Sequence, residues 1–243
     1  MSSPPSPAAV APGGVIIVAG PFGSGKTEVA LALADCWARD RAVTLADLDV
    51  VTPYFRSRDA GAAQLAAAVD VLAPEGEAAA SDVPVIAARL APALGDRGRL
   101  VIVDCGGDPV GATVLAQFRA LLLDRQTRMA IVLNPRRPDT PAPEAAATVV
   151  RQLVQAAGLP LGGLVANGNM GWLTTLDDFD DGVELAIQVA ALLGTEVLFA
   201  AAPEDLAPEC ALRAPQLPLL PIRRRLAVSW EGAPAGRGET APE

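Results

Sequence analysis

Short, continuous apolar runs recur along the chain and are separated by segments with helical spacing. The runs occupy residues 15–19, 42–48, 100–105, 129–133, 161–167 and 196–201. Continuous rather than alternating apolar character is typical of strands buried on both faces of a parallel sheet. Apolar residues at helical spacing follow the first run and precede the fifth and sixth, around residues 29–37, 149–157 and 185–192. The pattern predicts an α/β fold, a mostly parallel twisted sheet with helices on both faces.

The two ends of the chain differ in composition from the rest. Residues 1–13 are rich in Pro, Ser and Ala, and residues 227–243 are rich in Gly, Pro and Glu, which predicts disordered tails. No linker or internal repeat interrupts residues 14–226, so a single domain is the simplest interpretation. Within it, the alanine-rich segment 60–98 predicts one or two more helices, one of them capped by Ser81 or Asp82.

Composition narrows the possible functions. A net charge of −9 argues against a nucleic-acid surface built from bulk positive charge. The chain has no histidine, and its three cysteines, Cys36, Cys105 and Cys210, form no CxxC pair, so neither a disulfide framework nor an ordinary zinc site is expected. Chemistry would therefore depend on carboxylates, positioned water or a metal ion. Without a secretory signal or an apolar run of about 18 residues, we expect a cytoplasmic protein.

The strongest motif is GPFGSGKTE, residues 20–28, which contains the only lysine among the 19 lysine and arginine residues. It matches G-x-x-x-x-G-K-[ST], and it lies between the first predicted strand and a predicted helix, as a phosphate-binding loop must. Glycines let backbone N–H groups face phosphate oxygens, and the helix N-terminus adds partial positive charge. Lys26 would bind the β and γ phosphates and the Thr27 hydroxyl would ligate Mg²⁺. The loop prediction comprises Gly20, Gly23, Ser24, Gly25, Lys26, Thr27 and Glu28.

Two further strands end in acidic residues. Residues 100–111, LVIVDCGGDPVG, place Asp104 at a strand end, where it could hold Mg²⁺, and Gly107 where its N–H could meet a γ-phosphate. Residues 43–59 carry Asp47 and Asp49, of which one could bind Mg²⁺ through water and the other could orient the attacking water. The alternative for these aspartates is an ordinary turn, and Asp108 could simply cap the next helix. A catalytic use of Arg56 or Arg58 also stays open.

The order of these motifs, followed by LGGLVANGN at 161–169, resembles the SIMIBI class of P-loop NTPases. The similarity is greatest to the branch that holds the MinD and ParA ATPases, the nitrogenase iron protein and the cobyrinate and dethiobiotin synthetases. The resemblance implies a P-loop three-layer sandwich, phosphate binding by Lys26, Mg²⁺ binding by Thr27 and Asp104, and water positioning by Asp49. It also implies that Asn167 reads the adenine edge, although Asn167 could equally be a turn residue.

The sequence departs from this branch in one place and from GTP-reading proteins in another. The MinD and ParA loop carries a second lysine that reaches across a dimer, and Pro21 stands at that position here. Lysine-dependent catalysis across subunits is therefore not expected, although a homodimer is still possible. The guanine-reading N-K-x-D pattern is absent at both Asn134 and Asn167, which favours ATP over GTP.

Three functions are consistent with these motifs. The first is a slow Mg²⁺-dependent ATPase that acts as a nucleotide-driven switch on an unidentified protein partner. The second is an ATP-dependent transferase or ligase that acts on a small molecule. The third is a nucleotide-binding module with negligible turnover.

Overall fold

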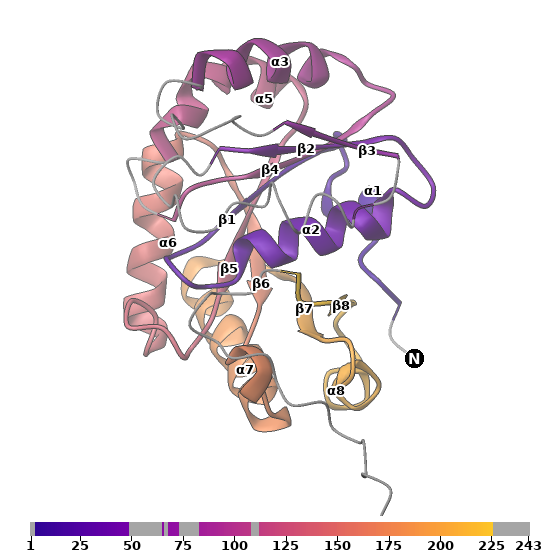
Figure 1. Ribbon diagram of the computed structural model, residues 1–243. Coiled ribbons are helices and arrows are strands. Elements are labelled where there is room, and N and C mark those ends of the chain that lie inside the picture. The colour runs from indigo at the N-terminus through magenta and orange to yellow at the C-terminus, as the bar shows by residue number, and fades with distance from the viewer. Residues whose placement is uncertain (1–2, 49–64, 66–67, 73–82, 108–111, 226–243) are drawn as a thin grey trace, which may run out of the picture.

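The fold is a single parallel sheet with helices on both faces (Figure 1). The computed structural model describes residues 3–48, 65, 68–72, 83–107 and 112–225. Within these, the 8-stranded sheet has the order β3-β2-β4-β1-β5-β6-β7-β8, and every neighbouring pair is parallel. The strands are β1 Val15–Ala19, β2 Val43–Asp47, β3 Val69–Leu72, β4 Leu100–Asp104, β5 Arg128–Leu133, β6 Leu161–Ala166, β7 Val197–Pro203 and β8 Leu219–Ile222.

Helices connect these strands and cover the sheet. The α-helices are α1 Pro7–Val10, α2 Lys26–Trp37, α3 Val83–Gly95, α5 Arg119–Asp124, α6 Pro143–Ala157, α7 Leu176–Leu193 and α8 Ala207–Arg213. Two short 3-10 helices, η3 Val114–Phe118 and η4 Gly171–Leu173, complete the described elements. A parallel pair of strands needs such a crossover, because each strand must return to the same end of the sheet before the next begins.

The alternating side chains of β1 divide the core into two layers. Ile17 packs with residues of α3, α5, α6 and α7, including Leu90, Leu122 and Val150. Ile16 faces the opposite side, where α2 contributes Val29, Leu33 and Trp37. Successive side chains of a strand point to opposite faces, so a continuous apolar run is what a strand covered on both sides requires. The predicted three-layer α/β architecture is confirmed.

Two edge strands were not predicted. β3 is only four residues long and its burial is incomplete, and β8 contains Pro221. Short edge strands give weak periodic signals, and proline is tolerated at sheet edges because its missing N–H faces outward.

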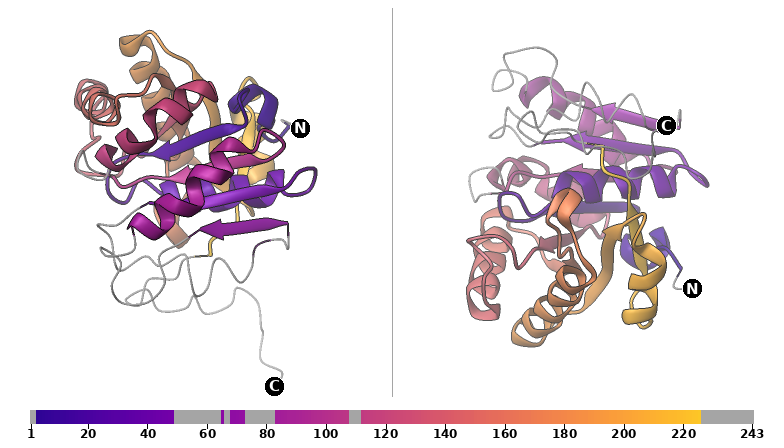
Figure 2. Two further views of the ribbon diagram at one scale, coloured as in Figure 1. Left: turned by 90° about the horizontal axis from the view of Figure 1, so that it is seen from above. Right: turned by 60° about the horizontal axis from the view of Figure 1, so that its bottom comes forward.

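The described part of the N-terminal segment differs from the disordered tail that its composition predicts. Val10 and Ala11 are buried against the core. The indole Nε1 of Trp37 donates a hydrogen bond to the Pro5 carbonyl at 2.9 Å, and the Leu219 N–H donates to the Ser3 carbonyl at 3.3 Å. Figure 2 shows the resulting position of α1 beside the C-terminal strands. Prolines favour extended backbone, which is typical of a tail. In this chain, however, the prolines precede Val10, an apolar residue that is buried in the core. The predicted C-terminal tail lies outside the described residues.

Candidate phosphate-binding site

The phosphate-loop motif lies at the carboxyl end of β1, in the middle of the sheet. The loop turns through Gly23 with φ 71° and Gly25 with φ 90°, and α2 then begins at Lys26. Both angles lie in the left-handed region, which glycine adopts without strain. Gly25 is the N-cap of α2 and has no side chain that could cap the helix. A glycine N-cap at the start of a helix is an arrangement that binds phosphate, because it lets a ligand approach the first N–H groups of the helix closely.

Neighbouring strand ends press directly against this loop. A side-chain carbon on Gly20 would lie 2.6 Å from the Val132 carbonyl oxygen and 2.7 Å from the Ser24 hydroxyl. A side-chain carbon on Gly107, which follows β4, would lie 2.8 Å from the Gly20 carbonyl oxygen. These positions therefore accept only glycine without a shift in the backbone. The Ser24 hydroxyl is fully buried and has no hydrogen-bond partner among the described residues, so the loop carries a polar atom that a phosphate could satisfy.

The predicted side chains of α2 lie at its first turn. Lys26 is the first residue of the helix, and only 6 % of it is exposed. Thr27 is half-buried beside it. The Glu28 carboxylate accepts a hydrogen bond from the backbone N–H of Arg225 at 3.0 Å, so this side chain ties α2 to the segment after β8.

The acidic residues come together through the strand register. Asp104 is the last residue of β4 and is 3 % exposed, and it pairs in register with Val18 of β1 and with Asp47 of β2. Both aspartates therefore lie at the carboxyl ends of their strands, on the side of the sheet where the phosphate loop begins. Asp49, Asp108, Arg56 and Arg58 lie outside the described residues.

Thr27, Asp47 and Asp104 are the residues that could hold Mg²⁺. The described residues contain no group of three or more His, Cys, Asp or Glu side chains suited to a metal. Mg²⁺ at phosphate sites takes one or two carboxylates and completes its shell with water and phosphate oxygens. A hydroxyl with one or two carboxylates therefore fits a magnesium ion that arrives with nucleotide.

Asn167 follows β6 and is in direct contact with the loop. It is 3 % exposed, and its Nδ2 donates a buried hydrogen bond to the Ser24 carbonyl at 2.7 Å. A side-chain carbon on Gly25 would lie only 2.3 Å from the same Nδ2. The Asn167 amide thus holds the loop backbone, a role that the sequence did not indicate. The contact with adenine stays a prediction.

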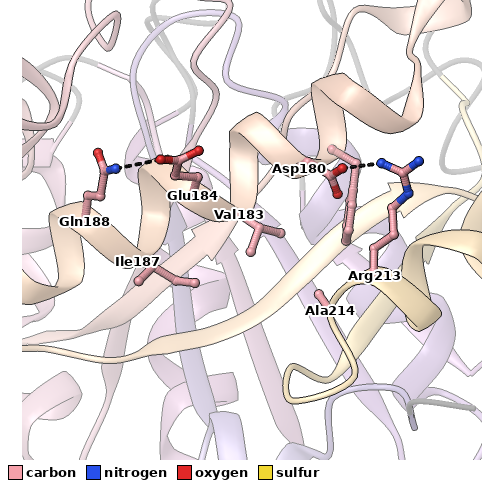
Figure 3. A pocket seen from close by; sticks show the side chains of 8 residues that line it. Asp180, Val183, Glu184, Ile187, Gln188, Arg213 and Ala214 are labelled. Atoms are coloured by element: carbon pink, nitrogen blue, oxygen red, sulfur yellow. Dashed lines mark hydrogen bonds and ion pairs between the residues drawn. The ribbon is translucent and has the colours of Figure 1, made fainter.

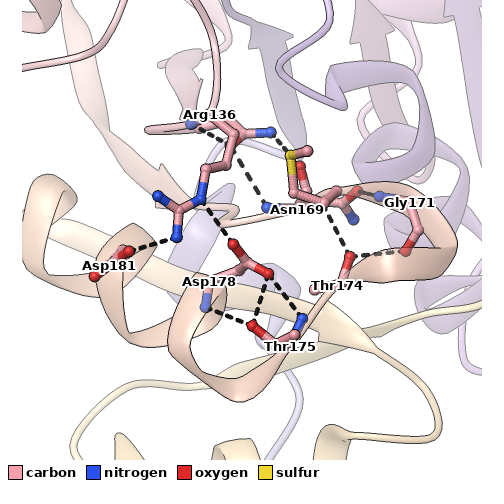
Figure 4. A network of polar contacts seen from close by, with 9 residues as sticks. Arg136, Asn169, Gly171, Thr174, Thr175, Asp178 and Asp181 are labelled. Atoms are coloured by element: carbon pink, nitrogen blue, oxygen red, sulfur yellow. Dashed lines mark hydrogen bonds and ion pairs between the residues drawn. The ribbon is translucent and has the colours of Figure 1, made fainter.

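The loop after β5 also borders the site, although no sequence motif indicated a role for it. Its Asn134 is fully buried, and the Nδ2 of Asn134 donates to the Asn169 carbonyl at 2.8 Å. Next along the chain, the Arg136 guanidinium donates to Asp178 at 2.7 Å and to Asp181 at 2.6 Å, as Figure 4 shows. The polar run NPRRPD directly follows a buried strand, and this could have indicated that the loop lies near the site. The carboxyl ends of parallel strands share one side of the sheet.

Asp178 links this loop to α7 and is the most strongly bonded carboxylate of the network. It forms a capping box with Thr175, whose N–H and hydroxyl both donate to Asp178 Oδ2 at 2.8 Å. Burial alone would raise the pKa of Asp178, but the hydrogen bonds from Thr175 and Arg136 outweigh it and hold the pKa below its ordinary value. Asp178 is therefore ionised at neutral pH.

A shallow groove between α7 and α8 contains none of the predicted site residues. Figure 3 shows Val183 and Ile187 of α7 beside Arg213 and Ala214, with Arg213 paired to Asp180. Cys210 is buried nearby, and desolvation raises its pKa to about 11, so its thiol is protonated at neutral pH. We assign no chemistry to this groove.

No protein-family model matches the chain, and no curated protein matches it either. Within the described part of the chain, no helix has both the length and the apolar character that crossing a bilayer requires.

Solved structures of FtsY share the fold. FtsY from Mycoplasma mycoides superposes with a TM-score of 0.52 and 14% identity, over 77% of this chain and 59% of that chain. Chloroplast FtsY from Physcomitrella patens gives 0.51 and 16%, over 76% and 57%. The signal recognition particle receptor FtsY from Elizabethkingia anophelis in complex with GDP gives 0.51 and 20%, over 77% and 56%. The chain thus spans less than two thirds of each of these structures, and identities this low concern the fold alone. The shared fold is the α/β fold described above, a parallel sheet with helices on both faces, as the apolar pattern predicted.

Proposed function

We propose that the chain binds ATP with Mg²⁺ at the loop 20–28, hydrolyses it slowly, and acts as a nucleotide-driven switch. The observation that carries the proposal is the shape of the loop. Two glycines in the left-handed region, the second of them the N-cap, lead into a helix N-terminus, and a buried lysine is the first residue of that helix. Backbone N–H groups and a helix dipole that converge on one point favour a phosphate group.

The roles of the individual residues follow from their positions. Lys26 would supply a compact positive charge to the β and γ phosphates, and Thr27 and Asp104 would hold the magnesium ion. The bound ion would neutralise charge on the phosphate oxygens. Gly107, whose backbone lies against Gly20, would direct its N–H toward the end of the phosphate chain. Asp49, two residues beyond Asp47, would orient the attacking water.

The hydrogen bond of Asn167 favours adenine over guanine. One of the two N–H groups of its amide donates to the Ser24 carbonyl, which leaves the other N–H and the Oδ1 acceptor. Among the described residues, none donates a hydrogen bond to its Oδ1, so the side chain can offer a base an acceptor. Adenine presents an amine donor beside a ring acceptor, which the amide oxygen and the second N–H can match as a pair, whereas guanine presents two acceptors at the same edge.

The proposal is tested by phosphate release from ATP and from GTP with Mg²⁺ present. We expect slow turnover of ATP. Turnover of GTP should be about one tenth of that rate or slower, in line with the loss of one base hydrogen bond. Asp49→Asn should keep ATP binding and lose turnover, because its amide is a poor acceptor for the proton of the attacking water.

The other outcomes separate the alternatives. Phosphate release only after a metabolite is added would replace the switch by a transferase or ligase. Binding of ATP without release under any condition would leave a nucleotide-binding module. Faster turnover of GTP than of ATP would contradict the role assigned to Asn167.

A further inference from the structure

The turn after β5 is built so that its backbone is fixed beside the phosphate loop. The Asn134 carbonyl accepts hydrogen bonds from the Arg137 N–H at 3.2 Å and from the Thr140 hydroxyl at 2.6 Å. The Arg137 carbonyl in turn accepts from the Thr140 N–H at 3.1 Å, and both Asn134 and Thr140 are fully buried. A side chain on this turn therefore starts from a well-defined position.

Two neighbouring arginines of this turn have different surroundings. Arg136 is ion-paired with two carboxylates of α7, Asp178 and Asp181. The Arg137 side chain instead lies against the phosphate loop: a side-chain carbon on Gly23 would be 3.3 Å from its Nε and 3.6 Å from its Cζ. The guanidinium of Arg137 thus borders the loop that Lys26 follows.

The Arg137 guanidinium makes no hydrogen bond or ion pair with any residue that the structure describes, and its Nε is buried without a partner. Burial of a guanidinium donor without an acceptor is unfavourable, so natural structures rarely contain it without a reason. An acceptor that binds at the loop would remove the penalty. A phosphate is the complementary group, because it presents several charged oxygens to the planar fork of an arginine.

We propose that Arg137 is a second cationic ligand for the nucleotide phosphates, acting from the side of Gly23 while Lys26 acts from the start of α2. This role rests on the proposed function of the loop and goes beyond it, since none of the motifs of the loop includes Arg137. The residue binds phosphate from a fixed turn of the same chain and requires no partner subunit.

The test compares Mg²⁺–ATP affinity, by calorimetry, of the wild-type chain with that of Arg137→Gln, Arg137→Lys and Arg151→Gln. Arg151 is the matched control, because it is exposed on α6, forms no ion pair among the described residues, and changes the net charge by the same amount. We expect Arg137→Gln to bind about 10-fold to 100-fold more weakly, the range for a hydrogen bond to a charged group. Arg137→Lys should recover part of the loss, and Arg151→Gln should bind as the wild type does.

The melting temperature of the nucleotide-free protein distinguishes ligand binding from a structural role. Removing a buried donor that has no partner should leave this temperature unchanged or raise it. The proposal would be overturned if Arg137→Gln bound Mg²⁺–ATP within twofold of the affinity of Arg151→Gln. A clear drop in the melting temperature of nucleotide-free Arg137→Gln would also overturn it. Wild-type protein that does not bind ATP would refute the proposed function itself, whereas wild-type binding with an unaffected Arg137→Gln variant would refute only the role of Arg137.

Discussion

At the scale of single residues, the site depends on contacts that leave no room for side chains. The backbone of Gly25 is in the left-handed region, and the amide nitrogen of Asn167 lies directly beside it. A methyl group on Gly25 would displace that nitrogen. The same amide supports the loop through the Ser24 carbonyl. One asparagine therefore couples the end of β6 to the backbone that would surround the phosphates.

We expect Gly25→Ala to lower the free energy of unfolding by about 3 kcal/mol, since left-handed strain adds to the loss of a buried hydrogen bond. Gly194→Ala is the matched control: Gly194 has φ 63° and open space around it, so strain alone should lower the free energy of unfolding by about 1 kcal/mol. Urea unfolding of both variants measures the difference. If both variants lose the same free energy of unfolding, the contact between Gly25 and Asn167 does not contribute to stability.

At the scale of elements, the capping box of α7 and the turn after β5 act as one unit. Asp178 accepts hydrogen bonds from Thr175 within its own helix and from Arg136 of the turn. The N-terminus of an 18-residue helix is thereby fixed to the edge of the sheet where the phosphate loop lies. This arrangement holds the neighbouring Arg137 in place.

We expect Asp178→Asn to lower the free energy of unfolding by about 1–2 kcal/mol at pH 7, the usual range for a helix cap. Because the pKa of Asp178 is lower in the folded state, its ionisation stabilises the fold above the unfolded pKa of about 4, and the effect is lost as the pH falls through the folded value. The gap between variant and wild type should therefore narrow below about pH 4. Urea unfolding at several pH values measures it.

Asp177→Asn serves as the control for this experiment, because its side chain is 91% exposed in the same first helical turn. It should lower the free energy of unfolding by a few tenths of a kcal/mol, through the helix dipole and an exposed ion pair with Arg213 at 3.8 Å. The account of the capping box is contradicted if the two variants lose the same amount at pH 7.

At the scale of the whole molecule, the sequence predicted the architecture because six buried strands read as continuous apolar runs. It also placed Lys26, Asp104 and Gly107 correctly at the edge of the sheet, since the phosphate-loop motif fixes where its neighbours must lie. The contacts of Asn167 and Arg137 with the loop join residues far apart in sequence. No local pattern encodes such contacts, because they depend on the strand order and on the path of one turn.

The N-terminal segment shows the same limit. Its composition predicts a tail, yet Trp37 and Arg125 supply donors to the carbonyls of Pro5 and Gly13. Those donors lie in other parts of the chain, so composition alone could not reveal them. Long-range hydrogen bonds, rather than local preference, decide whether such a segment packs.

The central claim is that the loop 20–28 binds nucleotide, and calorimetric titration of Mg²⁺–ATP tests it most directly. We expect one ATP per wild-type chain, and at least 100-fold weaker binding by Lys26→Ala, since the variant loses a buried charge that would face the phosphates. Lys26→Arg should also bind weakly, because a planar guanidinium does not fit the space of an ammonium. If both variants bind ATP as tightly as the wild type, the loop is not the nucleotide site and the proposed function is wrong.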